Sequence, residues 1–207
     1  MQEAFVGGWT QESHLSAELL GSLRDLNHRF LDLAASRADV WTAADGCLPL
    51  RLARQLAPLS TAQRAAAADC PYALFDLRFE DDAHWRMRLE AGGGWRVTEA
   101  PAADDDMVGF VRLALFYAWH VASGAGLKAQ LLLGMNAGTA AALRRTTVHQ
   151  LPSLVASEAP NLSARWSDCS AFWHTLSDAA LRADTATLRR VQLYGLQLAA
   201  AARFPKS

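Results

Sequence analysis

Apolar residues recur every three or four positions along most of the chain, which is the spacing of one face of an α-helix. The first such stretch follows Ser13 and Ser16, either of which can cap a helix N-terminus. Its apolar positions are Leu15, Leu19, Leu23, Leu26, Phe30 and Leu33. A second stretch begins near Asp106, and its apolar positions are Phe110, Leu113, Tyr117 and Val121. We therefore predict one long helix in each half of the chain.

Shorter stretches with the same spacing follow each long helix. They predict helices at about 48–57, 61–69, 135–145, 148–157 and 185–203. Ser60 and Thr147 precede two of these stretches and are the expected N-caps. The fold is therefore expected to be mostly α-helical.

One segment departs from this spacing, because apolar and polar residues alternate between about residues 73 and 98, as they do in a half-buried strand. The alternating apolar positions are Phe75, Leu77, Phe79, Trp85, Met87, Leu89, Trp95 and Val97. Three glycines at 92–94 lack the following lysine of a phosphate-binding loop, so we interpret them as a hairpin turn. The segment is predicted to form a small antiparallel β-meander.

The chain also matches itself when it is shifted by 87 residues, without a gap. LAASRA at 33–38 falls opposite HVASGA at 120–125, and Gln63 falls opposite Gln150. We therefore predict two copies of one helical repeat, at 1–103 and 104–207, with the β-meander in the first copy. Pro101, beside three aspartates, marks the expected junction between the copies.

The charge is uneven along the chain, although 20 basic and 21 acidic residues leave a net charge of −1. Residues 1–107 hold 10 basic and 17 acidic side chains, whereas residues 108–207 hold 10 and 4. The basic half could face a polyanion, or the two halves could attract each other within the chain or between copies. The three cysteines lie far apart, and we expect neither a signal peptide nor a membrane span. The sequence therefore predicts a cytoplasmic protein.

No arrangement of residues points to an enzyme. The six histidines do not form an HExxH or His-x-His pattern, and no Cys-x-x-Cys pair is present. We therefore expect no catalytic residues, no metal site and no cofactor.

The basic side chains of the second half are candidates for contact with phosphate or with a partner. They are Arg144, Arg145, Arg182, Arg189 and Arg190. The helices on either side of residues 145–147 have the outline of a helix-turn-helix, but only His149 could read a base there. The alternative is that these arginines are solvated on helix faces and helix ends.

Seven tryptophans are many for a chain of 207 residues, and most are expected in the core. Trp85 and Trp95 would lie on adjacent strands of the predicted meander, and so small a sheet leaves one face to be covered. We therefore predict a partner interface at these two residues, because tryptophan is enriched at interaction surfaces.

Both copies resemble the FlhD family, the small all-helical subunit of the flagellar transcriptional activator. The first copy is similar to the family's first helix, through LLGSLRDLNHRFLDLA at 19–34. The second copy is similar to the family's middle helices. The matching segments there are LGM at 133–135, AAL at 141–143, TVHQL at 147–151 and ARWSD at 164–168. Family members form homodimers and bind DNA together with a zinc-containing partner subunit. The resemblance therefore implies an intramolecular pseudo-dimer. The chain departs from the family in its length, in the meander, and in having Phe75 and Leu162 where the family has an intersubunit cysteine.

These observations predict a transcriptional regulator or co-regulator that works as a protein adaptor. It would act with a partner subunit or by self-association, and its basic half would contact promoter DNA weakly as part of a complex, without a membrane. The alternative is a structural interaction module, such as an assembly or secretion accessory protein, that binds no DNA. A regulator predicts that the five arginines converge on one face, whereas an accessory module predicts scattered arginines and an apolar patch.

Overall fold

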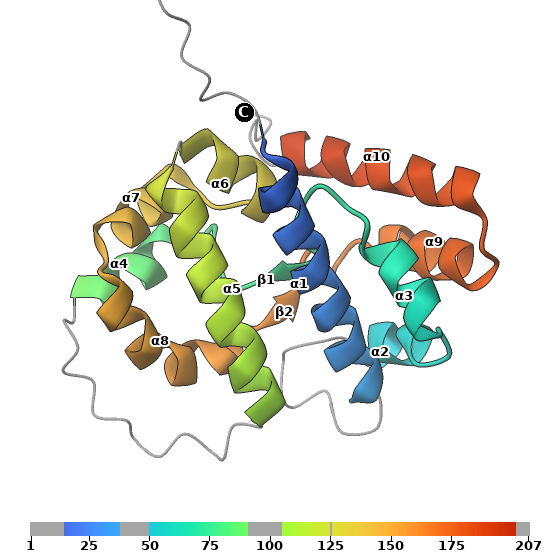
Figure 1. Cartoon of the computed structure of the whole chain (residues 1–207), viewed down its shortest axis with the longest axis horizontal. Helices are drawn as coiled ribbons and strands as arrows, with labels where there is room; N and C mark the ends of the chain where they lie inside the picture. The colour runs from blue at the N-terminus through green and yellow to red at the C-terminus, as the bar shows by residue number, and fades with distance from the viewer. Residues whose placement is uncertain (1–14, 38–49, 91–104, 125, 202–207) are drawn as a thin grey trace, which may run out of the picture.

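The computed structural model describes residues 15–37, 50–90, 105–124 and 126–201. Within these ranges the chain folds into ten α-helices and one two-stranded antiparallel sheet (Figure 1). The predicted, mostly helical class is confirmed. None of the helices in the described ranges is long and apolar enough to span a bilayer.

Two long helices, α1 (Ala17–Ser36) and α5 (Asp105–Ser123), run antiparallel through the middle of the molecule (Figure 1). Near one end, Tyr117 in α5 donates a hydrogen bond to the carbonyl of Leu19 over 3.1 Å. Between the helices, the ring of Phe110 packs edge-on against Phe75 with the ring centroids 5.1 Å apart. Ser16 caps α1 by accepting a hydrogen bond from the backbone of Leu19, as the sequence predicted.

Each long helix carries a pair of shorter ones. The pair on α1 is α2 (Leu50–Leu56) and α3 (Thr61–Ala68), and the pair on α5 is α7 (Ala137–Arg145) and α8 (Leu151–Glu158), with the 3₁₀ turn η1 (Val148–Gln150) leading into α8. Both pairs have the same capping box between their two helices, in which a hydroxyl residue and a glutamine bond reciprocally. These residues are Ser60 with Gln63, and Thr147 with Gln150.

The strands β1 (Phe75–Asp76) and β2 (Ser163–Ala164) pair at the centre, with Phe75 opposite Ala164 and Asp76 opposite Ser163. Each strand leads into a tight turn at a non-glycine residue with positive φ, which is 56° at Arg78 and 53° at Trp166. A helix follows each turn: α4 (Asp82–Glu90) in the first half and α9 (Ser170–Leu181) in the second. Most equivalent elements of the two halves thus begin 87 or 88 residues apart, whereas α8 begins 90 residues after α3 because η1 precedes it.

The β-meander predicted at 73–98 is wrong across its middle, where α4 lies. The side chain of Asp81 accepts a hydrogen bond from the backbone of His84 over 2.9 Å, which starts a helix at this point. Trp85, Met87 and Leu89 alternate in the sequence, but Trp85 is buried while Met87 is exposed on the helix surface. Residues 91–98 lie outside the described residues.

In each half, the last of the paired helices packs against the other half. Helix α4 of the first half packs on α7 of the second, and α9 of the second half packs on α2 and α3 of the first. Gly138 in α7 permits the close approach of α4, because a Cβ at this position would overlap the carboxylate of Asp82. The buried residues accordingly form one continuous cluster that includes both halves. The expected boundary between residues 103 and 104 lies outside the described residues.

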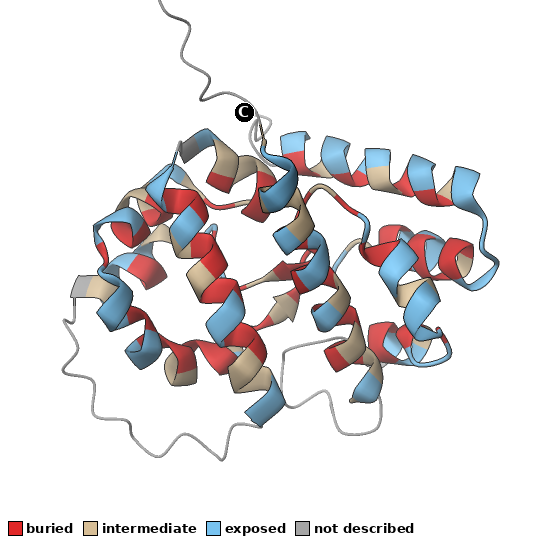
Figure 2. Cartoon of the chain, viewed as in Figure 1, coloured by how far each residue is buried: buried red, intermediate tan, exposed pale blue. Residues whose placement is uncertain are grey.

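Two helices were not matched between the halves, α6 (Gly126–Leu133) and α10 (Thr185–Ala201). Helix α10 covers α9, with its inner face buried and its outer face exposed along its length (Figure 2). Tyr72 reaches α10 at Gly195 and donates a hydrogen bond to the carbonyl of Gln192 over 3.1 Å. The sequence predicted α10 but not α6.

Candidate functional site

The five candidate arginines do not meet on one face. Arg144 and Arg145 are exposed in the last turn of α7, whereas Arg182, Arg189 and Arg190 are exposed where α9 leads into α10. These two regions lie at opposite ends of the long axis of the molecule (Figure 1). The arrangement therefore brings together two arginines at one end and three at the other.

Two carboxylates, Asp178 and Asp184, offset part of the positive charge at the α9–α10 end. Arg182 forms an ion pair with Asp178 at 3.0 Å, and Arg190 donates to the hydroxyl of Thr187 over 2.8 Å. The carboxylate of Asp184 lies close by, at the start of α10. This end of the molecule therefore does not present the strongly basic surface that a phosphate backbone attracts.

The prediction of a partner interface at Trp85 is wrong, because its side chain is fully buried. Its ring stacks on Phe79 with the centroids 5.8 Å apart, and its indole N–H donates to the carbonyls of Leu77 and Arg78. Trp85 therefore belongs to the core, where the positive φ of the turn at Arg78 brings those carbonyls within reach. Trp95 lies outside the described residues.

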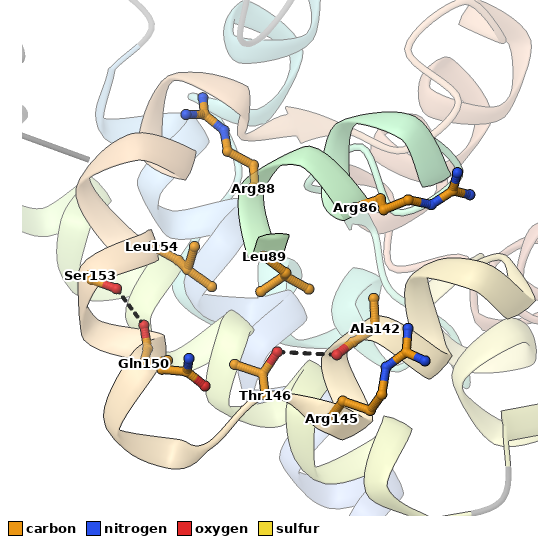
Figure 3. Close-up of a pocket in the computed structure, with 9 residues that line it drawn as sticks. All are labelled: Arg86, Arg88, Leu89, Ala142, Arg145, Thr146, Gln150, Ser153 and Leu154. Carbon is orange, nitrogen blue, oxygen red and sulfur yellow. Dashed lines mark hydrogen bonds between the residues drawn. The ribbon is translucent and has the colours of Figure 1, made fainter. Parts of the chain in front are cut away.

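A hollow of about 170 Å³ opens between α4, α7 and α8. Leu89 of α4 lies at its centre, with Leu154 of α8 on one side and Ala142 of α7 on the other (Figure 3). Polar residues complete the lining: Arg86, Arg88, Arg145, Thr146, Gln150 and Ser153. A cavity of about 150 Å³ holds a benzene molecule, so the hollow can accept one aliphatic or aromatic side chain.

A fully buried carboxylate fixes two of the three helices that form the hollow, α4 and α8. Glu158, at the end of α8, accepts hydrogen bonds from Nδ2 of Asn161 over 2.8 Å and from Nε2 of His84 over 2.9 Å. Its other oxygen forms an ion pair with Nε of Arg88 at 3.0 Å. Since His84 and Arg88 both belong to α4, this cluster ties α4 of the first half to α8 of the second half.

The lining offers hydrogen-bond donors beside an apolar floor. Gln150 is exposed, and its side-chain oxygen caps Thr147 with 2.8 Å between Oε1 and the Thr147 nitrogen, which leaves its amide NH₂ to donate to solvent or to a ligand. Arg145 contributes a guanidinium at the rim. None of the described lining residues is acidic. The hollow therefore suits a group that combines an apolar side chain with a hydrogen-bond acceptor or a negative charge.

A wider groove, of about 560 Å³, separates α1 from α5. Both signs of charge line it, from Arg29 and Arg112 to Asp32, Asp105 and Asp106. This mixture favours no ligand charge, so the α4–α7–α8 hollow is the better defined site.

Sequence reasoning predicted Arg145 but missed the rest of the site. A signal for Glu158 was present, because it is one of only 4 acidic residues in the basic half. The residues of α4 could not be assigned to the site while their segment was interpreted as strands.

No family model, curated protein or solved structure matches this chain. Among the described residues, no three histidine, cysteine, aspartate or glutamate side chains are grouped as metal ligands. The functional argument therefore depends on the chain's own geometry.

Proposed function

We propose that this protein is a helical adaptor that binds a segment of a partner protein in the α4–α7–α8 hollow. The observation that carries the proposal is the lining of the hollow, which joins an apolar floor at Leu89 and Leu154 to donors at Arg145 and Gln150. An apolar anchor in a pocket with a polar rim is the usual core of a protein interface. The separation of the arginines into two groups favours this adaptor over a protein that reads DNA by itself.

The resemblance to FlhD supports a regulatory form of this proposal, in which the adaptor works within a transcription complex. In this interpretation the chain consists of two copies of one helical unit, paired as a pseudo-dimer. The interval of 87 or 88 residues between most equivalent elements supports the interpretation. So do the two capping boxes and the two positive-φ turns, which recur at the same intervals. An accessory module without any regulatory role would use the same hollow, and the separation of the arginines into two groups is the result that this alternative predicts.

The proposal is tested by co-purification from the native host with two charge-reversal variants. Arg145→Glu places a negative charge at the rim of the hollow, and Arg144→Glu is its matched control, because Arg144 is exposed on the same helix turn but does not line the hollow. A partner that is retained by wild type and Arg144→Glu but lost from Arg145→Glu supports the adaptor. A partner that all three proteins retain equally overturns the assignment of this hollow.

A second candidate function, weak contact with promoter DNA, is favoured by the exposed group Arg182, Arg189 and Arg190 at one end of α10. Helix α10 itself has no acidic residue, although Asp178 and Asp184 beside it offset part of the positive charge. Binding through phosphates must weaken steeply as the salt concentration rises. We would measure binding of duplex DNA to the purified complex at several salt concentrations, with wild type and the Arg189→Ala, Arg190→Ala double variant. Equal binding by the two proteins would refute this role.

A further inference from the structure

We infer that the groove between α9 and α10 binds an acidic amphipathic helix of a partner protein. The apolar face of that helix would pack against Tyr194 and Ala171, and one of its carboxylates would face Arg190. The groove lies at the opposite end of the long axis of the molecule from the α4–α7–α8 hollow (Figure 1). This inference goes beyond the proposed function, because it gives the adaptor a second docking surface through which one chain would join two proteins.

The groove has a volume of about 300 Å³. Its lining residues are Ala171, Phe172 and Thr175 of α9, and Thr187, Arg190, Val191 and Tyr194 of α10. Phe172 and Val191 are buried and form an apolar floor. Seven described residues separate Tyr194 from the segment that begins at residue 202, so no undescribed segment adjoins the lining residues in the sequence.

The other side of α10 shows what the α9–α10 pair accepts. Helix α3 lies there, and Nε2 of Gln192 in α10 donates to the carbonyl of Ala66 over 3.4 Å. Helix α3 also reaches the end of α9, because Nε2 of Gln63 donates to the carbonyl of Leu181 over 2.9 Å. Successive residues of a helix are rotated by about 100°, so Tyr194 lies about 200° from Gln192, on the side of the groove. The α9–α10 pair therefore has one side that packs against a helix and a second side that α9 and α10 alone line within the described residues.

The size of the groove fits two apolar side chains of one helix. A cavity of about 150 Å³ holds one benzene molecule, and the groove has about twice this volume. The α10 residues that line it lie within 187–194, which extends over about two helical turns. Side chains three or four positions apart lie on one face of a helix, about 5–6 Å from each other. A partner helix with apolar residues at this spacing can therefore fill the groove, as in other helix-in-groove complexes.

The exposed rim of the groove provides an aromatic anchor. Tyr194 is 42% exposed, although its ring lines the groove above the apolar floor. Tyrosine and arginine are enriched among the residues that contribute most to the affinity of protein interfaces. Tyr194 and Arg190 lie one helical turn apart and both line the groove. A single partner helix can therefore contact the two residues together.

The charge of the groove favours an acidic helix. None of its lining residues is acidic, and Arg190 carries its positive charge. Nη2 of Arg190 donates to the hydroxyl of Thr187 over 2.8 Å, and no carboxylate of the described residues forms an ion pair with it. Asp184, at the start of α10, offsets part of this charge, but Arg189 adds a second exposed guanidinium. A glutamate or aspartate beside the apolar face of the partner helix is therefore stabilised at this rim.

The probe for this inference is an alanine-based peptide of about 18 residues, which is long enough to form a helix in water. Its leucines are spaced by three and four positions, and glutamates stand on either side of them. One control peptide has lysine in place of every glutamate, and another has serine in place of every leucine. Each is titrated into the full-length protein labelled with ¹⁵N, while the backbone amide signal of Thr175 is followed by NMR.

The three peptides should differ in affinity. We expect a saturable shift with the acidic peptide, because it satisfies both the apolar floor and the charged rim. The dissociation constant should be about fivefold higher, or more, with the lysine peptide. The serine peptide should give no saturable shift, because it has no apolar side chains for the groove.

Two pairs of variants locate the bound peptide. Tyr194→Ala should weaken binding about fivefold or more, as truncation of an interface anchor does. Its matched control is Leu193→Ala, because Leu193 is 60% exposed on the same helix but does not line the groove. Arg190→Ala should weaken binding about fivefold. Arg189→Ala, the control for charge, should leave the dissociation constant nearly unchanged, because Arg189 does not line the groove.

Several results would overturn the inference. These are the absence of a saturable shift at Thr175, equal affinity for the glutamate and lysine peptides, and equal effects of the two members of either pair of variants. Stronger peptide binding by Phe204→Ala or Trp9→Ala would identify an end of this chain outside the described residues as the occupant. Displacement of the peptide by duplex DNA would assign the arginines of α10 to phosphate and would also overturn the inference.

The variant Arg145→Glu separates this groove from the hollow. It should leave peptide binding unchanged, and weaker binding would place the peptide in the α4–α7–α8 hollow and overturn the assignment to the groove. If the peptide fails to bind while Arg145→Glu still loses the native partner, the adaptor proposal stands and only the second docking surface is refuted.

Discussion

The buried carboxylate of Glu158 should hold the two sides of the hollow together, and the change that tests this is Glu158→Gln. The substitution preserves the shape of the side chain but removes its charge. In the native protein one carboxylate oxygen accepts hydrogen bonds from Asn161 at 2.8 Å and His84 at 2.9 Å, and the other lies 3.0 Å from Nε of Arg88 in an ion pair. An amide has only one oxygen, so it cannot satisfy Asn161 and His84 on one side and Arg88 on the other.

The size of the effect follows from burial. The Glu158 side chain is 0% exposed and that of Arg88 is 20% exposed. Breaking a buried ion pair by removing one partner costs about 3–5 kcal/mol. The remaining amide oxygen and the partial solvation of Arg88 reduce this cost. We therefore expect the free energy of unfolding to fall by about 2–3 kcal/mol, which corresponds to about 4–12 °C in Tm for a chain of this size.

Urea denaturation measures this change, provided that the m-value stays constant and the midpoint alone moves. The matched control is Asp178→Asn, which removes the same charge from the exposed ion pair with Arg182. An exposed pair contributes about 0–1 kcal/mol, so this control should change stability much less. The comparison separates the loss of a charge as such from the loss of a buried charge.

A double-mutant cycle with Arg88→Met decides whether the ion pair is responsible. The methionine keeps much of the aliphatic length but removes the positive charge that Glu158→Gln leaves without a counter-ion. The double variant should therefore be more stable than the sum of the two single effects predicts, by about 1 kcal/mol or more. Our reasoning is refuted if Glu158→Gln changes stability by less than about 0.5 kcal/mol, as an ordinary surface substitution does.

Three further predictions concern the core and α10. Burial raises the pKa of the Cys70 thiol to about 12, so near neutral pH iodoacetamide should modify the partly exposed Cys169 and spare Cys70, as peptide mass spectrometry would show. Hydrogen bonds at the start of α10 lower the pKa of Asp184 below its usual range. Its carboxylate therefore stabilises the fold above the unfolded pKa of about 3.9, and this contribution is lost as the pH falls through the lower folded pKa. Thermal melts of Asp184→Ala and wild type should differ at neutral pH and converge in acid. Gly195→Ala would place a Cβ against the hydroxyl of Tyr72, so it should lower stability by about 1–3 kcal/mol, and Tyr72→Phe should relieve part of that loss in a double variant.

The helices that could be predicted are those whose burial follows the helical period. In α1 the residues Leu23, Leu26 and Phe30 are spaced by three and four, and all three are buried. Ser60 and Thr147 could also be predicted as N-caps, because serine and threonine are preferred at the position just before a helix. These elements form through interactions between residues that are close in the sequence, so the sequence alone predicts them.

Helix α4 could not be recognised in this way, because its burial does not follow from its own sequence. Trp85 is buried against Phe79, Met87 is exposed, and Leu89 faces the hollow that α7 and α8 complete. The alternation of apolar positions in α4 therefore reflects its contacts with other parts of the fold and not pairing in a sheet. A comparison with a shift of 88 instead of 87 residues would have placed Trp85 opposite Trp173, whose indole also donates to the carbonyl eight residues before it.

The site escaped prediction for a related reason, which also bears on its function. Leu89 comes from the first half, whereas Arg145, Gln150 and Glu158 come from the second, so no contiguous segment contains the hollow. The hollow forms only because α4 packs on the helices of the other half. A ligand bound there would contact both halves and would stabilise the packing of α4 on the second half. The reason is that a molecule that binds only the folded state shifts the unfolding equilibrium toward the folded state. If the proposed partner binds in the hollow, its binding is coupled to the cohesion of the two halves, and Glu158→Gln should weaken both.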